Sequence, residues 1–222
     1  MKKLTVLRVA YILILLLNVL QVRADQHQPI KILVLGDSLS AAYKLAESSG
    51  WVYQLEQQLK NEDYALKIYN ASVSGATTAA GKQILPDALN RFKPDLVILE
   101  LGANDGLQGK PVAYISANLS HLITTSQKAD ADVLLLGVRL PPNRGKRYTE
   151  PFFQQYAQLS SRYQTGLVPF FLDGVAGNEA FMMADRLHPN AKGQRVIADL
   201  MYPYLKSYMD TQHFSSLKTV KE

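Results

Sequence analysis

Residues 30–38 read IKILVLGDS, an apolar run that ends in a glycine, an acid and a serine. The run is rich in isoleucine, leucine and valine and shows no alternation of polar and apolar residues. Strands that are buried on both faces have this composition, and such strands belong to parallel sheets. We therefore predict a buried strand at 32–35 and a turn that places Ser38 at its carboxyl end.

Four more short apolar runs follow, and residues with helical periodicity separate them. The runs cover 66–69, 96–101, 133–138 and 168–172. Helices are predicted to start near Gly50 and Pro111, to cover 78–91 with an interruption at Pro86, to span 150–163, and to follow the N-cap Asn190. The regular alternation of strand and helix predicts an α/β fold, a three-layer α/β/α sandwich with a five-stranded parallel sheet.

Residues 1–24 differ in character from the remainder of the chain. A basic start, MKK, precedes an apolar stretch at 9–17, and a branched and a small residue follow at 22 and 24. This layout is typical of a secretory signal peptide. A membrane anchor is the alternative, but the stretch is shorter than the ~20 residues that span a bilayer. We expect a mature chain of 25–222 that forms a single domain, with a loose polar tail at 210–222 and a periplasmic or secreted location.

The charge balance and the cysteine count exclude several function classes. The whole chain has a net charge of +5, and residues 1–24 hold four basic residues and no acid, so the mature chain carries about +1. A nucleic-acid partner would require a basic patch, and we expect none. The chain has no cysteine. Disulfides, thiol nucleophiles and thiolate metal sites are therefore excluded.

Three polar segments follow the first three predicted strands: 36–40, 70–75 and 102–106. Sites in open parallel sheets form at the carboxyl ends of strands, so these segments are expected to meet at one edge. Asp185 and His188 lie in a loop before the last helix, where they can reach that edge. Each residue alone has an ordinary explanation as a turn or cap residue. Their occurrence together favours a catalytic site.

The residue types predict a nucleophile, a base and an acid. Ser38 is the candidate nucleophile, His188 its general base, and Asp185 the carboxylate that orients the imidazole. Of the four histidines, only His188 has a carboxylate nearby in a loop, and the lack of a second nearby histidine weakens any zinc hypothesis. The predicted oxyanion donors are the backbone N–H groups of Ser38 and Gly75 and the side-chain amide of Asn104.

These segments resemble the four sequence blocks of the SGNH (GDSL) hydrolase superfamily. The blocks centre on the serine of Gly-Asp-Ser, a glycine, the asparagine of Gly-x-Asn-Asp and the histidine of Asp-x-x-His. Here they fall, in the order of the family, on Ser38, Gly75, Asn104 and His188. The resemblance implies a flavodoxin-like core and hydrolysis of acyl esters without metal or cofactor.

Further stretches look like the bacterial periplasmic branch of that superfamily, which is described as thioesterase, arylesterase and lysophospholipase. They include GDSLSA at 36–41, GANDGL at 102–107 and PPNRGKRY at 141–148. The resemblance implies broad activity on acyl esters and thioesters. It also implies that the segment 75–80 moves with the acyl chain. That branch often has Gly-Ile where this chain has Arg186 and Leu187.

Ala76, Leu107 and Pro141 are predicted to wall an acyl groove, and a small-molecule or lipid ester is the expected partner of a monomeric enzyme. Two alternatives remain open at this stage. A carbohydrate O-deacetylase can use the same triad and would have a short acetyl pocket. A non-catalytic envelope binding protein could retain the fold, but the complete set of candidate catalytic residues counts against it.

Overall fold

A computed structural model describes residues 29–211. The five strands form a single sheet, in the order β2-β1-β3-β4-β5, and every neighbouring pair is parallel. The strands are β1 (Ile30–Gly36), β2 (Leu66–Asn70), β3 (Leu96–Glu100), β4 (Asp132–Leu136) and β5 (Gly166–Val168). Because all strands run the same way, the segments after them meet at one edge of the sheet.

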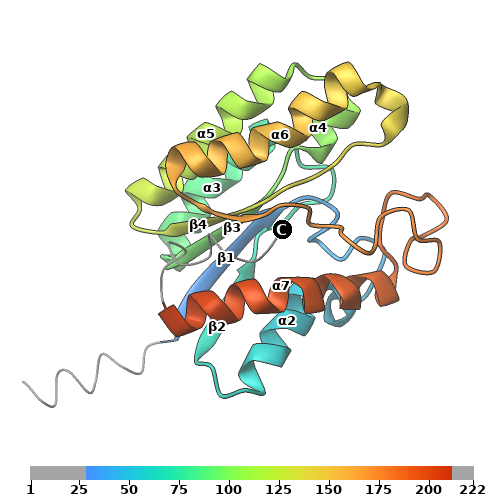
Figure 1. The fold of residues 1–222 in the computed structure, drawn as a ribbon. Helices are drawn as coiled ribbons and strands as arrows, with labels where there is room; N and C mark the ends of the chain where they lie inside the picture. The colour runs from blue at the N-terminus through green and yellow to red at the C-terminus, as the bar shows by residue number, and fades with distance from the viewer. Residues whose placement is uncertain (1–28, 212–222) are drawn as a thin grey trace, which may run out of the picture.

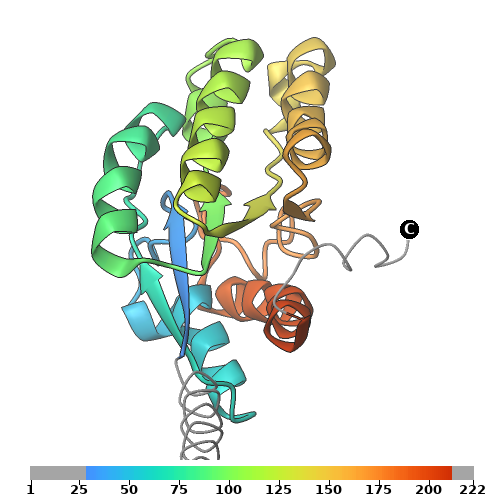
Figure 2. The same ribbon diagram turned by 90° about the vertical axis from the view of Figure 1, so that its left-hand side faces the viewer.

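Helices cover both faces of the sheet (Figures 1 and 2). Helices α2 (Trp51–Lys60) and α7 (Ala191–Thr211) lie on one face. Helices α3 (Thr78–Phe92), α5 (Val112–Lys128) and α6 (Lys146–Tyr163) lie on the other. Three short helices occupy connections: η1 (Glu47–Ser49), α4 (Ala103–Leu107) and η2 (Pro142–Arg144). The predicted three-layer α/β/α fold is confirmed.

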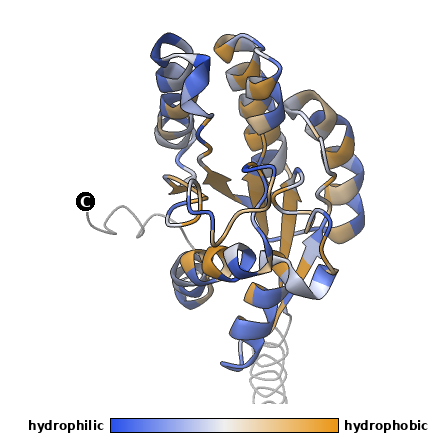
Figure 3. Cartoon of the chain, turned by 90° about the vertical axis from the view of Figure 1, so that its right-hand side faces the viewer, coloured by the Kyte–Doolittle hydropathy of each residue, from blue (hydrophilic) through white to orange (hydrophobic). Residues whose placement is uncertain are grey.

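One hydrophobic core lies on each face of the sheet, because successive side chains of a strand point to opposite faces. In β1, Ile32 and Val34 pack with α2 and α7, whereas Leu33 and Leu35 pack with α3, α5 and α6. All four side chains are completely buried. Figure 3 shows the result as hydrophobic strands between helices whose outer faces are hydrophilic. This double burial explains why the strand sequences contain no polar alternation.

The fifth strand is shorter and earlier than predicted. It covers Gly166–Val168, and the predicted run 168–172 shares only Val168 with it. Pro169 has no N–H to continue the ladder. Phe171 and Leu172 are nevertheless buried, because the chain turns there and the N–H of Phe171 donates to the carbonyl of Gly137 at 2.8 Å. The apolar run was therefore a buried turn and not a strand.

Three helical predictions also differ from the structure. Helix α3 continues through Pro86, which is exposed, while Leu85, Ala88 and Leu89 hold the helix against the sheet. Helix α6 starts at Lys146, earlier than expected, and contains Pro151. The last helix extends to Thr211, so the start of the predicted tail is helical. The predicted signal segment 1–24 and tail residues 212–222 lie outside the described residues.

Candidate active site

Ser38 lies in the turn after β1, at the carboxyl edge of the sheet, and its side chain is half-buried. Its Oγ lies 2.9 Å from Nε2 of His188. Asp37 stabilises the turn through both its backbone carbonyl and its side-chain carboxylate. Its carbonyl accepts the N–H of Ala41 at 3.0 Å, and its Oδ1 accepts the N–H of Leu39 at 3.0 Å. These bonds direct the Ser38 hydroxyl toward the imidazole.

His188 lies in the loop between β5 and α7, and its Nδ1 is 2.9 Å from Oδ2 of Asp185. The other carboxylate oxygen of Asp185 accepts the N–H groups of His188 and Leu187, each at 3.0 Å. These backbone bonds, with the imidazole, lower the pKa of Asp185 from 3.8 to about 2. Asp185 is thus ionised at neutral pH. An anionic acceptor at Nδ1 favours the tautomer in which Nε2 is free to take the proton of Ser38.

The loop that carries His188 is tied to the start of α7. The N–H of Met183 donates to the carbonyl of His188 at 2.7 Å. Nδ2 of Asn190 donates to the carbonyls of Ala180 and Met182, at 3.0 and 3.2 Å. Oδ1 of the same residue caps α7, as predicted, by accepting the N–H groups of the second and third helical residues. One side chain therefore joins the helix to the loop.

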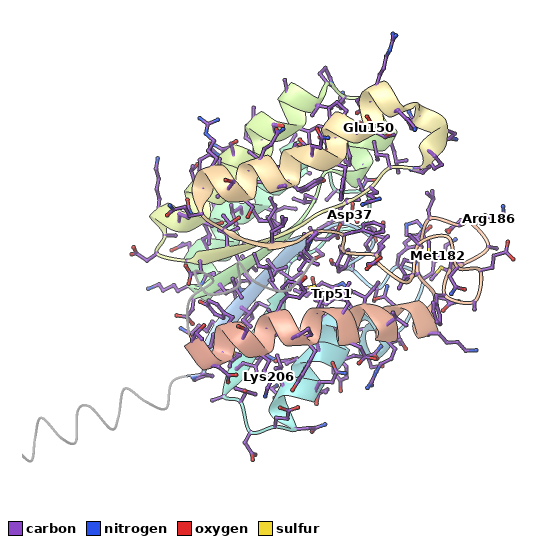
Figure 4. All side chains as sticks on the ribbon, viewed as in Figure 1. Asp37, Trp51, Glu150, Met182, Arg186 and Lys206 are labelled. Atoms are coloured by element: carbon purple, nitrogen blue, oxygen red, sulfur yellow. The ribbon has the colours of Figure 1, made fainter. Side chains whose placement is uncertain are left out.

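Arg186 separates the acid from the histidine and has a positive φ of 56°. Glycine adopts this conformation at lower cost than arginine. The guanidinium of Arg186 pairs with Glu179, with an N–O distance of 3.0 Å. Figure 4 shows Arg186 at the outer edge of the loop, away from the sheet, and Met182 on its inner side. The arginine thus extends away from the catalytic candidates.

The three predicted oxyanion donors follow three adjacent strands. Gly75 follows β2 with a φ of 83°, Ser38 follows β1, and Asn104 lies in α4 after β3. Within residues 29–211, the backbone N–H groups of Ser38 and Gly75 donate to no protein acceptor. The amide of Asn104 is engaged, because its Nδ2 donates to Oδ2 of Asp37 at 2.9 Å and to the carbonyl of Ala76 at 3.0 Å.

A pair of buried carboxyl groups lies behind Ser38. Oε2 of Glu100, the last residue of β3, accepts Oγ–H of Ser40 at 2.9 Å and the N–H of Asp37 at 3.2 Å. Burial raises the pKa of Glu100 well above 4.5, and the charge of Asp37 raises it further. Burial also raises the pKa of Asp37, to about 6. The shifts therefore favour an arrangement in which Glu100 holds the proton of the pair and Asp37 carries the charge.

Gly36 is required by this arrangement. A Cβ at this position would lie 2.7 Å from Oε2 of Glu100 and 2.9 Å from Oγ of Ser40. Any other residue would push the glutamate away from the turn. The glycine of the GDS motif therefore makes room for the carboxyl group that holds the nucleophile turn.

A pocket of about 170 Å³ opens beside Ser38 and His188. Of the predicted acyl walls, Leu107 and Pro141 line it, but Ala76 does not, because its side chain is buried in the core. Six further lining side chains are apolar, namely Leu39, Ala103, Val138, Leu140, Leu172 and Leu187, and three are polar, namely Asp37, Asn104 and Arg139. Two larger hollows, of about 380 and 520 Å³, lie elsewhere and are lined by none of the three catalytic candidates.

Sequence reasoning missed two residues of the site. The ring centroids of Tyr43 and His188 lie 4.3 Å apart, and the planes of the two rings are tilted by 35° to each other. No sequence signal indicated this contact. Glu100 did leave a signal, since it is an acid inside the otherwise apolar run 96–101. An acidic residue at a position buried on both sides must form hydrogen bonds with a polar group nearby.

Two further features of the described part of the chain bear on cofactors and membranes. Between residues 29 and 211, no three side chains of histidine, aspartate or glutamate gather where they could hold a metal ion. In the same residues no helix has both the length and the hydropathy needed to cross a bilayer.

Comparisons with known proteins show the family of the chain. The sequence pattern of the GDSL-like lipase/acylhydrolase family matches residues 34–196. The chain is 45% identical to esterase TesA of Pseudomonas aeruginosa over 175 residues, covering 79% of this chain and 87% of that protein. It is 37% identical to thioesterase 1/protease 1/lysophospholipase L1 of Escherichia coli, covering 79% of this chain and 83% of the relative. The crystal structure of psychrotrophic esterase EstA from Pseudoalteromonas, inhibited by monoethylphosphonate, superposes with a TM-score of 0.78 at 40% identity. That match covers 82% of this chain and 99% of EstA.

Proposed function

Because the chain belongs to the GDSL-like lipase/acylhydrolase family, we propose that Ser38 is the nucleophile of its hydrolytic reaction. The protein is a serine hydrolase with esterase or thioesterase function, like its relatives. One observation supports the assignment of the catalytic roles to Ser38, His188 and Asp185. Two contacts of 2.9 Å link Ser38 to His188 and His188 to Asp185 beside an open apolar pocket.

In the proposed mechanism, Oγ of Ser38 attacks the acyl carbonyl carbon while its proton passes to Nε2 of His188. Asp185 stabilises the imidazolium that forms. The tetrahedral intermediate collapses, the alcohol or thiol leaves with the proton from His188, and an acyl-enzyme remains. Water then enters, gives a proton to His188 and attacks the acyl carbon. Collapse of the second intermediate releases the acid and returns the proton to Ser38.

The oxyanion that forms in each half of the reaction requires donors aimed at it. The free N–H groups of Ser38 and Gly75 supply two of them. Asn104 supplies the third, although both hydrogens of its amide have acceptors in the free enzyme. The bond to Asp37 is charge-assisted and is retained, while the bond to the Ala76 carbonyl is shared with the oxyanion.

The pocket favours an acyl chain over an acetyl group. Its walls continue past Ser38 along Leu107, Leu140 and Pro141, which are all apolar. An O-deacetylase binds only an acetyl group and does not require such an extended apolar wall. We assign the enzyme to acyl esters and thioesters, with monoacyl lipids among its substrates. Rates on p-nitrophenyl esters from acetate to palmitate measure this preference, and a maximum at acetate would favour the deacetylase.

The location and assembly of the enzyme are part of the same proposal. A cleaved segment at 1–24 would leave a mature monomeric domain of 25–222 in the periplasm or outside the cell. The support is the basic and apolar layout of the segment. N-terminal sequencing of the exported protein locates the cleavage site. Light scattering after gel filtration measures the oligomeric state.

The decisive experiment replaces Ser38. Ser38→Ala is expected to abolish hydrolysis of p-nitrophenyl esters while the circular dichroism spectrum and melting temperature stay close to wild type. A fluorophosphonate probe is expected to label Ser38 in the wild-type protein and nothing in the variant. Turnover by a well-folded Ser38→Ala protein would overturn the assignment, as would labelling at another residue.

A further inference from the structure

The imidazole of His188 has a neighbour that the proposed reaction does not use. The ring of Tyr43 lies against it, with the two ring centroids 4.3 Å apart. Tyr43 is half-buried and does not line the pocket beside Ser38, so a substrate in that pocket is not expected to touch it. Within residues 29–211, the Tyr43 hydroxyl forms no hydrogen bond with the protein. The residue therefore meets the catalytic base with its ring alone.

The nucleophile turn places this ring at a cost in backbone conformation. Ala42 and Lys44, on either side of Tyr43, have positive φ angles of 52° and 55°. The left-handed region is unfavourable for residues other than glycine, and such strain concentrates at functional sites. The N–H of Tyr43 donates to the carbonyl of Ser38 at 3.4 Å, which closes the turn on the nucleophile. Both strained residues thus flank a side chain that contacts the catalytic base.

The groups around the imidazole are of two kinds. Asp185 and Ser38 hold its two nitrogen atoms, each at 2.9 Å. The buried carboxylate of Asp37 interacts with it electrostatically. Tyr43 instead contacts the plane of the ring. Lys44 Nζ lies 5.1 Å from the centroid of the Tyr43 ring, but the lysine is exposed, so water and salt screen its charge.

The face of an aromatic ring carries partial negative charge, and it stabilises a nearby cation more than a neutral group. In the proposed reaction His188 changes from one to the other. It is neutral before Ser38 attacks, and it is positively charged once it has taken the serine proton. A contact with the ring face therefore lowers the energy of the transition state more than that of the resting enzyme, which is the condition for raising kcat.

We propose that Tyr43 is a positioning residue that stabilises the imidazolium of His188 through its ring face. The same contact keeps the imidazole between Ser38 and Asp185. This inference rests on the proposed roles of Ser38 and His188, and it adds a residue outside the triad and the oxyanion donors. The strained turn fixes the ring before the substrate arrives, so the contact requires no rearrangement during the reaction.

The test changes the ring face and the side-chain volume separately. Tyr43→Phe keeps the ring face and removes only the unbonded hydroxyl. Trifluorophenylalanine, incorporated at position 43 with a suppressor tRNA, has nearly the shape of phenylalanine, but its fluorine atoms withdraw negative charge from the ring face. Tyr43→Leu fills space without a ring. The control Tyr114→Leu removes an exposed ring of α5 that does not line the pocket. Thermal melts verify that each variant folds.

The kcat for p-nitrophenyl esters is expected to follow the ring face and not the side-chain volume. Tyr43→Phe and the control should stay within about twofold of the wild type. The trifluorophenylalanine variant should lose about fivefold and Tyr43→Leu about tenfold, the range of a partly screened cation–π contact. KM should change little in all of them, because the ring does not line the pocket.

Equal kcat values for the phenylalanine and trifluorophenylalanine variants would overturn the proposal, because the contact would then act through packing alone. A normal kcat in folded Tyr43→Leu would do the same, as would a loss confined to KM, which would make the ring part of the substrate wall. If Tyr43→Leu does not fold, the two ring variants still decide the question. Failure of the proposed function looks different, since the wild type would then hydrolyse no ester or Ser38→Ala would retain turnover.

Discussion

The amide of Asn104 lies between a carboxylate and a carbonyl, and this position decides how its variants should behave. Asp37 accepts one of its hydrogens at 2.9 Å. We predict that Asn104→Ala lowers kcat by about 10²–10³ and changes KM little, because the amide meets charge that exists only in the transition state. Steady-state kinetics on p-nitrophenyl esters measures both constants.

Asn104→Asp is the matched control for this prediction. Aspartate suits a turn or a short helix as well as asparagine does, so a purely structural role would tolerate it. In the proposed role it replaces a donor with an anion beside the ionised Asp37, and the loss should be at least as large as with alanine. A kcat close to wild type in folded Asn104→Asp would remove Asn104 from the mechanism.

At this scale the sequence predicted the contacts among Ser38, His188 and Asp185 but not those of the residues around them. Asp185 and His188 are three residues apart, so a single turn brings them together and local spacing was sufficient. Ser38 reaches His188 across 150 residues, which required the rule that sites form at strand ends. Glu100 and Tyr43 were missed because their contacts depend on tertiary packing, which the spacing of residues along the chain does not encode.

Among the elements, α7 has a second task besides packing on the sheet. Asn190 caps it and also bonds to the loop that carries His188. We predict that Asn190→Ala costs more than the ~1 kcal/mol of a lost cap, because two loop carbonyls lose their donor as well. We also expect kcat to fall, since the loop then holds the imidazole less firmly. Urea unfolding and steady-state kinetics measure the two effects.

Asn190→Asp separates the two tasks. Aspartate keeps the acceptor for the N–H groups of Lys192 and Gly193, but it cannot donate to the carbonyls of Ala180 and Met182. Stability should therefore lie between that of the wild type and Asn190→Ala, while kcat should fall in both variants. Normal kcat in both would mean that the amide does not position the loop.

The elements were predictable where composition and burial agree. The runs at β1, β3 and β4 are apolar and buried on both faces, so their strands were identified. The run 168–172 is equally apolar but forms a turn, because burial alone does not distinguish a strand from a packed turn. Pro86 did not interrupt α3, since it lies on the exposed side, where water can solvate the carbonyl left without a donor.

In the whole molecule, the site lies where the two cores meet at the carboxyl edge of the sheet, and Glu100 is buried there at a cost. A carboxyl group whose pKa is raised by folding contributes fully to stability below its unfolded pKa, 4.5 for Glu100. That contribution is lost as the pH rises through the folded pKa. Asp37 behaves in the same way between 3.8 and about 6. Both groups therefore make the folded protein less stable as the pH rises from acid to neutral.

Glu100→Gln should reduce this pH dependence. Glutamine is neutral at every pH, and its Oε1 can still accept from Ser40 Oγ and from the N–H of Asp37. We predict that the free energy of unfolding of the variant, relative to that of the wild type, is higher at pH 8 than at pH 4.5. Urea unfolding at both pH values measures the difference. The control Glu150→Gln removes an exposed carboxylate from α6 (Figure 4) and should give no comparable change. If Glu100→Gln keeps the pH dependence of the wild type, Glu100 is not the buried neutral acid that holds the nucleophile turn.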